Sequence, residues 1–162
     1  MDIDWVDLII VLIFGGAITL GIKRGFGKSI FDFAAGLITV RIAAILHPPL
    51  AHRLTILSSQ QANSALIYAG FFVLLAAAVW LVSKVAYEST AISLDTFDPP
   101  LGGIVGFFIA VILAHAFSKT YFIAANQGGQ MPPALAQSIL GAELYGFTTY
   151  HNVISFLKGL TG

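Results

Sequence analysis

Charged and titratable side chains inside long apolar stretches are the first candidates for chemistry in this sequence. Asp7, Asp32, Arg41 and Lys84 lie within or beside such stretches, and so does the histidine His115. A charge in the hydrocarbon of a membrane is costly, so it usually has a partner or a function such as transport or proton relay. The spacing of these residues decides which of them can meet.

Arg41 carries the costliest of these charges. It lies about 20 Å along the helix axis from Lys28 and its Cβ points back toward the bilayer centre, at a cost of about 2 to 3 kcal/mol. Asp32 cannot offset this cost, because helical geometry puts it half a turn away and roughly 13 Å along the axis. Asp7 reaches the depth of Arg41 if the first two apolar segments form an antiparallel hairpin. We therefore predict an ion pair between Asp7 and Arg41.

Asp32 and the histidines suggest no reaction. Asp32 is one turn from Lys28, so its carboxylate can lean into the inner membrane interface. His115 has no residue of metal-ligand type three or four positions away, which favours a hydrogen-bonded packing role over a proton relay or metal site. His47 and His52 flank two prolines and do not share a helical face as zinc ligands would. HExxH, GxSxG and Walker-type motifs are absent from the sequence, so we expect no enzyme, no cofactor and no metal.

Composition places the chain in a membrane. Its 162 residues are 57% hydrophobic and 10% charged, whereas soluble domains have about 25% charged residues. The net charge is zero and the basic residues form one short cluster, so nucleic acid is not an expected partner. The chain has no cysteine, which excludes disulfides and thiol catalysis.

The stretch 21–28 holds three of the eight basic residues and lies between two apolar segments. The positive-inside rule assigns this stretch to the cytoplasm and the acidic start of the chain, with Asp2 and Asp4, to the outside. An acidic start also argues against a cleaved signal peptide. We expect a cytoplasmic anchor that is the hinge of a hairpin and a candidate docking point, consisting of Lys23, Arg24, Gly25, Phe26 and Lys28.

Four apolar segments predict an all-α membrane protein with four transmembrane helices. The spans are about 5–22, 29–46, 64–83, and 101–118 or longer. The prolines after His47 are expected to end the second helix, whereas Asp98 suits an N-cap and Pro99 the first helical position of the fourth.

Four crossings return the chain to the outside. Residues 1–125 then form the transmembrane domain, and 126–162 form an extracytoplasmic tail with one or two short amphipathic helices. These helices can lie on the outer leaflet or pack onto the bundle, and the sequence leaves both arrangements open.

Gly102 and Gly106 form a small-xxx-small pattern in the fourth span. Such patterns let helices approach closely, either between two copies of a chain or within one bundle. We favour packing within the bundle, because the pattern is common in transmembrane helices generally.

Short motifs along the chain support a family resemblance. In chain order they are Asp4-Trp5-Val6-Asp7, Arg24-Gly25-Phe26 with Lys28, the set Asp98, Leu101, Gly102 and Gly106, and Ser138 in the tail. Together they resemble the colicin V production protein family (CvpA), which are small bacterial inner-membrane proteins. The chain departs from the family pattern at Ser29, where an acidic residue is usual, and at Pro99, Ile109 and Ala110, where arginines or glycine are common.

The resemblance implies a non-enzymatic, multi-pass accessory protein of the inner membrane that supports colicin V or toxin production, or export, and envelope homeostasis. Its expected partners are the lipid bilayer and other membrane or export-system proteins, with a homo-oligomer left open. The alternative is a small oligomeric channel or transporter in which Arg41, Asp32 and His115 line a path. Uninterrupted apolar runs and a single deep arginine disfavour that alternative.

Overall fold

The structure is a computed structural model of the chain, and it describes residues 4–90, 97–126 and 129–147. Five α-helices make up most of these ranges: α1 Trp5–Arg53, α2 Gln60–Thr90, α3 Asp98–Ala125, α4 Pro133–Gln137 and α5 Ile139–Gly146. No β-strand lies in the same ranges. The expected all-helical fold is therefore confirmed.

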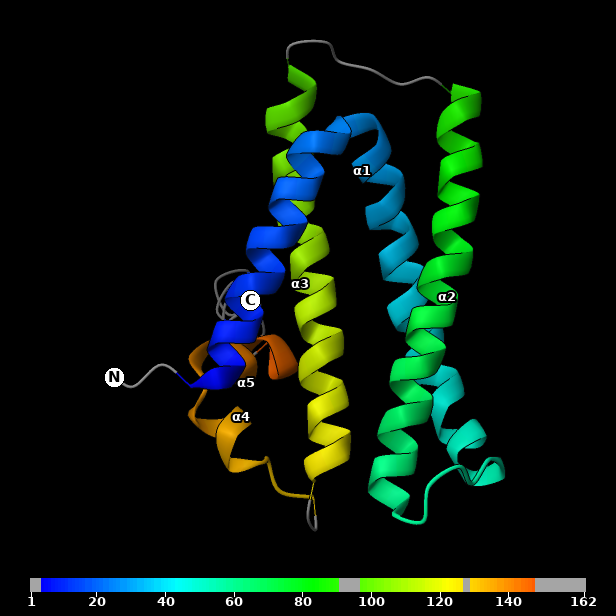
Figure 1. Cartoon of the computed structure of the whole chain (residues 1–162), viewed down its shortest axis with the longest axis vertical. Coiled ribbons are helices and arrows are strands. Elements are labelled where there is room, and N and C mark those ends of the chain that lie inside the picture. Colours follow the sequence, from blue (N-terminus) through cyan, green and yellow to red (C-terminus); the bar gives the residue numbers. More distant parts are fainter. Residues whose placement is uncertain (1–3, 91–96, 127–128, 148–162) are drawn as a thin grey trace, which may run out of the picture.

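Helix α1 is a bent hairpin rather than a straight rod. Gly25 has φ 77° and ψ 172°, a backbone conformation that is essentially restricted to glycine, and it divides α1 into a first arm before it and a second arm after it. The first arm lies beside α3 and the second arm beside α2 (Figure 1). The hinge thus falls inside the basic stretch 21–28, whose remaining residues are helical rather than a loop.

Two prolines do not end α1 where the sequence predicts. The second span was expected to stop near Leu46, but the helix continues through Pro48 and Pro49 to Arg53. Proline has a fixed φ that suits the first turn of a helix, so the pair can begin a last helical turn even though each residue lacks a backbone donor. That turn ends with the Leu54 N–H donating to Leu50 O at 2.9 Å.

By length and composition, three helices could cross a membrane: Trp5–Arg53, Gln60–Val85 and Asp98–Ala125. A straight helix as long as α1 would extend roughly 70 Å, more than twice the thickness of the hydrocarbon core. The bend at Gly25 divides the helix into two arms, each of a length that can cross a bilayer. Large apolar side chains such as Leu12 and Leu74 are exposed, which agrees with a surface that faces lipid.

Small residues bring the first arm of α1 into backbone contact with α3. A Cβ added to Gly106 would lie 2.6 Å from Ala17 O, and one added to Gly21 would lie 2.9 Å from Gly106 Cα. A Cβ added to Gly102 would likewise meet the backbones of Gly21 and Gly25. The face formed by Gly102 and Gly106 is therefore occupied within the chain.

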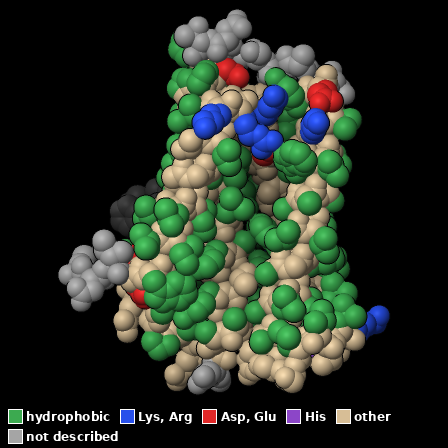
Figure 2. Space-filling view, in the orientation of Figure 1, with side chains coloured by type: hydrophobic (Ala, Val, Ile, Leu, Met, Phe, Trp, Pro, Cys, Tyr) green, Lys and Arg blue, Asp and Glu red, His purple; other side chains and the backbone are tan. Residues whose placement is uncertain are grey.

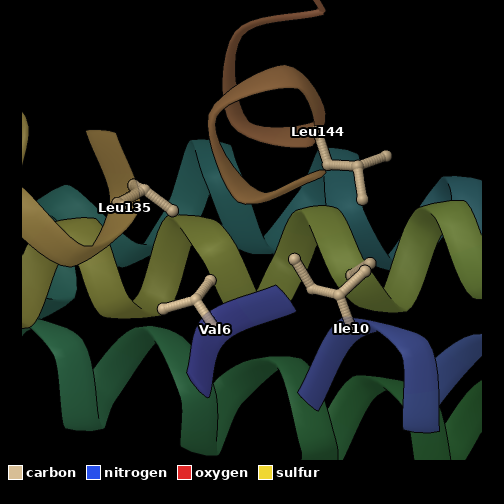
Figure 3. Close-up of a cluster of buried hydrophobic side chains, with 5 residues drawn as sticks. Val6, Ile10, Leu135 and Leu144 are labelled. Atoms are coloured by element: carbon tan, nitrogen blue, oxygen red, sulfur yellow. The ribbon is translucent and has the colours of Figure 1, made fainter. Parts of the chain in front are cut away.

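Helices α4 and α5 pack against the beginning of α1 and the last part of α3. Val6 and Ile10 of α1 face Leu135 of α4 and Leu144 of α5 (Figure 3), and Ala114 of α3 completes this buried cluster. In the described part of the tail, Leu135 and Leu144 thus lie on the bundle, whereas Ile139 and Leu140 are exposed. The rest of the predicted tail, residues 148–162, lies outside the described residues.

Replacing Gly106 with alanine tests the contact between α1 and α3. The added methyl group meets the Ala17 backbone, which cannot rotate away, so Gly106→Ala should lower the free energy of unfolding by about 1 to 3 kcal/mol. Gly70→Ala in α2 is the matched control, since nothing lies within 4 Å of its added Cβ. Thermal unfolding in detergent, followed by circular dichroism, measures both variants, and equal melting temperatures would contradict the contact.

Candidate functional site

The bend of α1 gathers basic side chains at one end of the molecule. Lys23, Arg24 and Lys28 come from the two sides of Gly25, and Lys84 comes from α2. Figure 2 shows Lys and Arg side chains gathered at the upper end of the view, above a hollow with hydrophobic side chains. The structure thus places the predicted cytoplasmic anchor at the rim of a cavity.

One face of α2 forms the opposite wall of this cavity. It consists of Trp80, Ser83, Lys84, Tyr87 and Glu88. These positions follow the spacing i, i+3, i+4, i+7 and i+8, which places side chains on one side of a helix. Sequence reasoning singled out Lys84 but missed the shared face, although this spacing would have revealed it.

The cavity has a volume of about 260 Å³ and is positively charged overall. Four basic and two acidic side chains line it. Arg24 donates to the Asp32 carboxylate at 2.6 Å, an ion pair across the bend that the sequence analysis did not predict. The Lys28 ammonium lies 5.1 Å from the centre of the Tyr87 ring, a cation–π distance. Ser83 donates to Phe31 O at 3.4 Å and so joins α2 to the second arm.

An apolar groove of about 410 Å³ continues from this cavity between the two arms of α1, α2 and α3. Arg24, Asp32 and Trp80 line both spaces. Further along, the groove is lined by large apolar side chains, including Leu12, Leu20, Phe72, Ile109 and Ile112. The polar cavity and the apolar groove therefore share a junction.

Asp98 lies in α3, but its side chain caps the second arm of α1. Its carboxylate accepts from the backbone N–H groups of Phe26 at 3.1 Å and Gly27 at 3.4 Å, which begin the second arm of α1. The first N–H groups of a helix generally have no carbonyl partner within that helix, and a carboxylate at a helix N-terminus is favourable. The prediction that Asp98 caps its own helix is therefore wrong. Pro99 does lie in the first turn of α3.

The predicted ion pair between Asp7 and Arg41 is not formed. The buried Asp7 carboxylate accepts from Ser138 Oγ at 2.6 Å and from the Leu140 N–H at 3.0 Å, at the beginning of α5. Ser138 Oγ in turn accepts from the Gly141 N–H at 2.7 Å. Arg41 is exposed on the second arm. Helical rise fixes the depth of a side chain, whereas the choice of partner depends on the direction it faces.

The three residues suggested for a transport path have separate surroundings. Asp32 pairs with Arg24, and Arg41 is exposed. His115 Nδ1 lies 2.8 Å from Leu144 O, and its ring lies beside Phe147. Among the described residues, the cavity and the groove are lined by Asp32 but by neither Arg41 nor His115. The three side chains thus do not line one common space.

A double-mutant cycle tests the cap between Asp98 and the bend. Asp98→Ala should cost about 1 kcal/mol of unfolding free energy through the lost cap. Gly25→Ala should cost about 1 to 3 kcal/mol through its positive φ, and more because its methyl group meets the Asp98 carboxylate. In the double variant that clash is gone, so the combined loss should be smaller than the sum. Chemical unfolding measures the cycle, and strictly additive losses would contradict the contact.

Comparison with known proteins places the chain in a family. Neither the curated proteins nor the solved structures contain a match. The sequence model of a family described as colicin V production protein matches residues 6–148. This range includes the bend at Gly25, Asp98 and the tail contact of Ser138, and it covers most of the chain. The chain therefore belongs to the colicin V production protein family.

Proposed function

We propose that this chain is a multi-pass, non-enzymatic accessory protein of the bacterial inner membrane that supports colicin V production or export and envelope homeostasis. The family match over residues 6–148 carries this proposal, because it spans the hairpin, α3 and the described tail helices. The apolar, lipid-compatible surface supports the membrane location.

Contacts with other membrane or export-system proteins are the proposed mode of action. Lys23, Lys28 and Lys84 are exposed around the cavity, so an anionic partner can reach them. The face of Gly102 and Gly106 is less suited to this role, because α1 occupies it. We therefore assign the docking surface to the basic anchor at the bend.

The proposed topology has four crossings, with both arms of α1 spanning the bilayer and the N-terminus outside. The basic residues gathered at the bend support a cytoplasmic position for that end. The acidic residues Asp4 and Asp7 begin the first arm at the opposite end. Residues 126–162 would then be extracytoplasmic.

Single-cysteine variants test this topology without background, because the chain has no cysteine. A membrane-impermeant maleimide should label Ser59→Cys in intact spheroplasts, since Ser59 lies between the second arm and α2. It should label Lys23→Cys only after lysis. Both positions are exposed, so accessibility does not limit the reaction. Labelling of Lys23→Cys in intact spheroplasts would reverse the proposed orientation.

Complementation tests the function. A colicin V producer that lacks its own family member should regain toxin release when it expresses this chain, measured as growth inhibition by the culture supernatant. Lys23→Gln combined with Lys28→Gln should reduce release several-fold, because the anchor loses two charges. Arg53→Gln, an exposed charge at the far end of the second arm, should not.

Membrane levels of each variant are measured in parallel by immunoblot. The accessory role fails if the chain reaches the membrane and release stays absent. Solute or ion flux through proteoliposomes of the purified chain that disappears with Arg41→Leu would instead favour the transporter alternative.

A further inference from the structure

The cavity at the bend and the apolar groove below it form one amphipathic space. They meet at Arg24, Asp32 and Trp80, which line both. One end presents ammonium groups and the other end presents hydrocarbon. A ligand that fills both ends must itself have a charged group joined to an apolar chain.

The charges at the polar end select an anion. Arg24 is neutralised by Asp32 at 2.6 Å. Lys23, Lys28 and Lys84 remain as cations at the rim, against the single carboxylate of Glu88. Within the described residues, no ion pair joins these lysines to a carboxylate. Phosphate groups are bound by such clusters of basic side chains beside membranes.

Small residues keep the apolar end open. Gly16, Ala17, Ala35, Gly36 and Ala76 line the groove. A Cβ added to Gly16 would meet nothing within 4 Å, so space adjoins the backbone there. The groove is wide enough for a ligand, since ligand pockets usually enclose about 300 to 1,000 Å³. A soluble anion would use the cavity and leave this apolar surface uncovered.

We propose that the cavity and groove bind one anionic phospholipid, with its phosphate among Lys23, Lys28 and Lys84 and an acyl chain in the groove. Trp80 lies at the junction, where the headgroup region meets the chain, as tryptophan does at membrane interfaces. The proposal depends on neither the orientation of the protein nor its role in colicin V production. It rests on the charge and shape of this space alone.

Tryptophan quenching tests the proposal directly. The chain has two tryptophans, so Trp5→Phe leaves Trp80 as the reporter. The protein is reconstituted in phosphatidylcholine vesicles that contain increasing fractions of phosphatidylglycerol with brominated acyl chains. Brominated phosphatidylglycerol should quench Trp80 at lower mole fractions than brominated phosphatidylcholine. Equal quenching by the two lipids would mean ordinary lipid contact and would overturn the proposal.

Charge variants test the polar end. Lys28→Gln and Lys84→Gln should each lower the preference for phosphatidylglycerol over phosphatidylcholine roughly fivefold, the contribution of one basic residue near an anionic lipid. Arg53→Gln, which does not line the cavity, should keep the preference. An unchanged preference in both lysine variants would overturn the proposal.

A matched pair of glycine variants tests the apolar end. Gly16→Leu fills the groove, whereas Gly15→Leu adds the same side chain at a neighbouring position that has equal space and does not line the groove. Phosphatidylglycerol quenching should fall in Gly16→Leu and persist in Gly15→Leu, with helicity by circular dichroism unchanged in both.

Inorganic phosphate distinguishes a lipid from a soluble anion. It should not raise the melting temperature of the detergent-purified protein as phosphatidylglycerol does. Equal protection by inorganic phosphate would show a soluble-anion site, and full phosphatidylglycerol preference in Gly16→Leu would show that the groove holds no acyl chain; either result would overturn the lipid proposal.

Discussion

The contact between the Asp98 carboxylate and the N–H groups of Phe26 and Gly27 stabilises the bend of α1, and the arrangement of the other helices depends on this bend. A chain reversal inside a helix leaves backbone donors without a helical partner, and at this bend Gly25 and Gly27 are buried, so their surroundings must supply the acceptor. Gly25 permits the reversal because it lacks a Cβ, and the carboxylate of α3 satisfies the donors that the reversal creates. The bend then sets the spacing of both arms from α2 and α3.

Close packing and open space lie on neighbouring faces of the first arm. Toward α3, Ala17 and Gly21 allow backbone contact with Gly106 and Gly102. Toward α2, Gly16 leaves a groove rather than a contact. Small residues therefore have two effects on neighbouring faces of one helix: they let the first arm touch α3, and they leave the groove unfilled on the side toward α2.

Sequence reasoning identified the class of the protein and the position of its hinge, because segment length, apolar content and clustered charge are properties of the chain itself. It failed for Asp7 and Asp98, because each bonds a helix terminus distant in sequence, Leu140 and Phe26 respectively. Arg41 was predicted as the partner of Asp7 because the two residues lie at similar depth along the helix axis. Depth does not determine which face of the helix carries a side chain, so the prediction failed. The shared face of Trp80, Lys84 and Tyr87 could have been predicted from helical periodicity. The cavity that it lines could not, because the cavity also depends on the bend of α1.

The bond between Asp7 and Ser138 joins residues that are 131 positions apart, near the two ends of the described chain. Asp7 is synthesised well before Ser138, so the first arm lacks this partner while α2 and α3 are made. The bond can form only after Ser138 and α5 have followed, so the tail helices complete the surroundings of the first arm. A chain truncated before Ser138 would lack this bond.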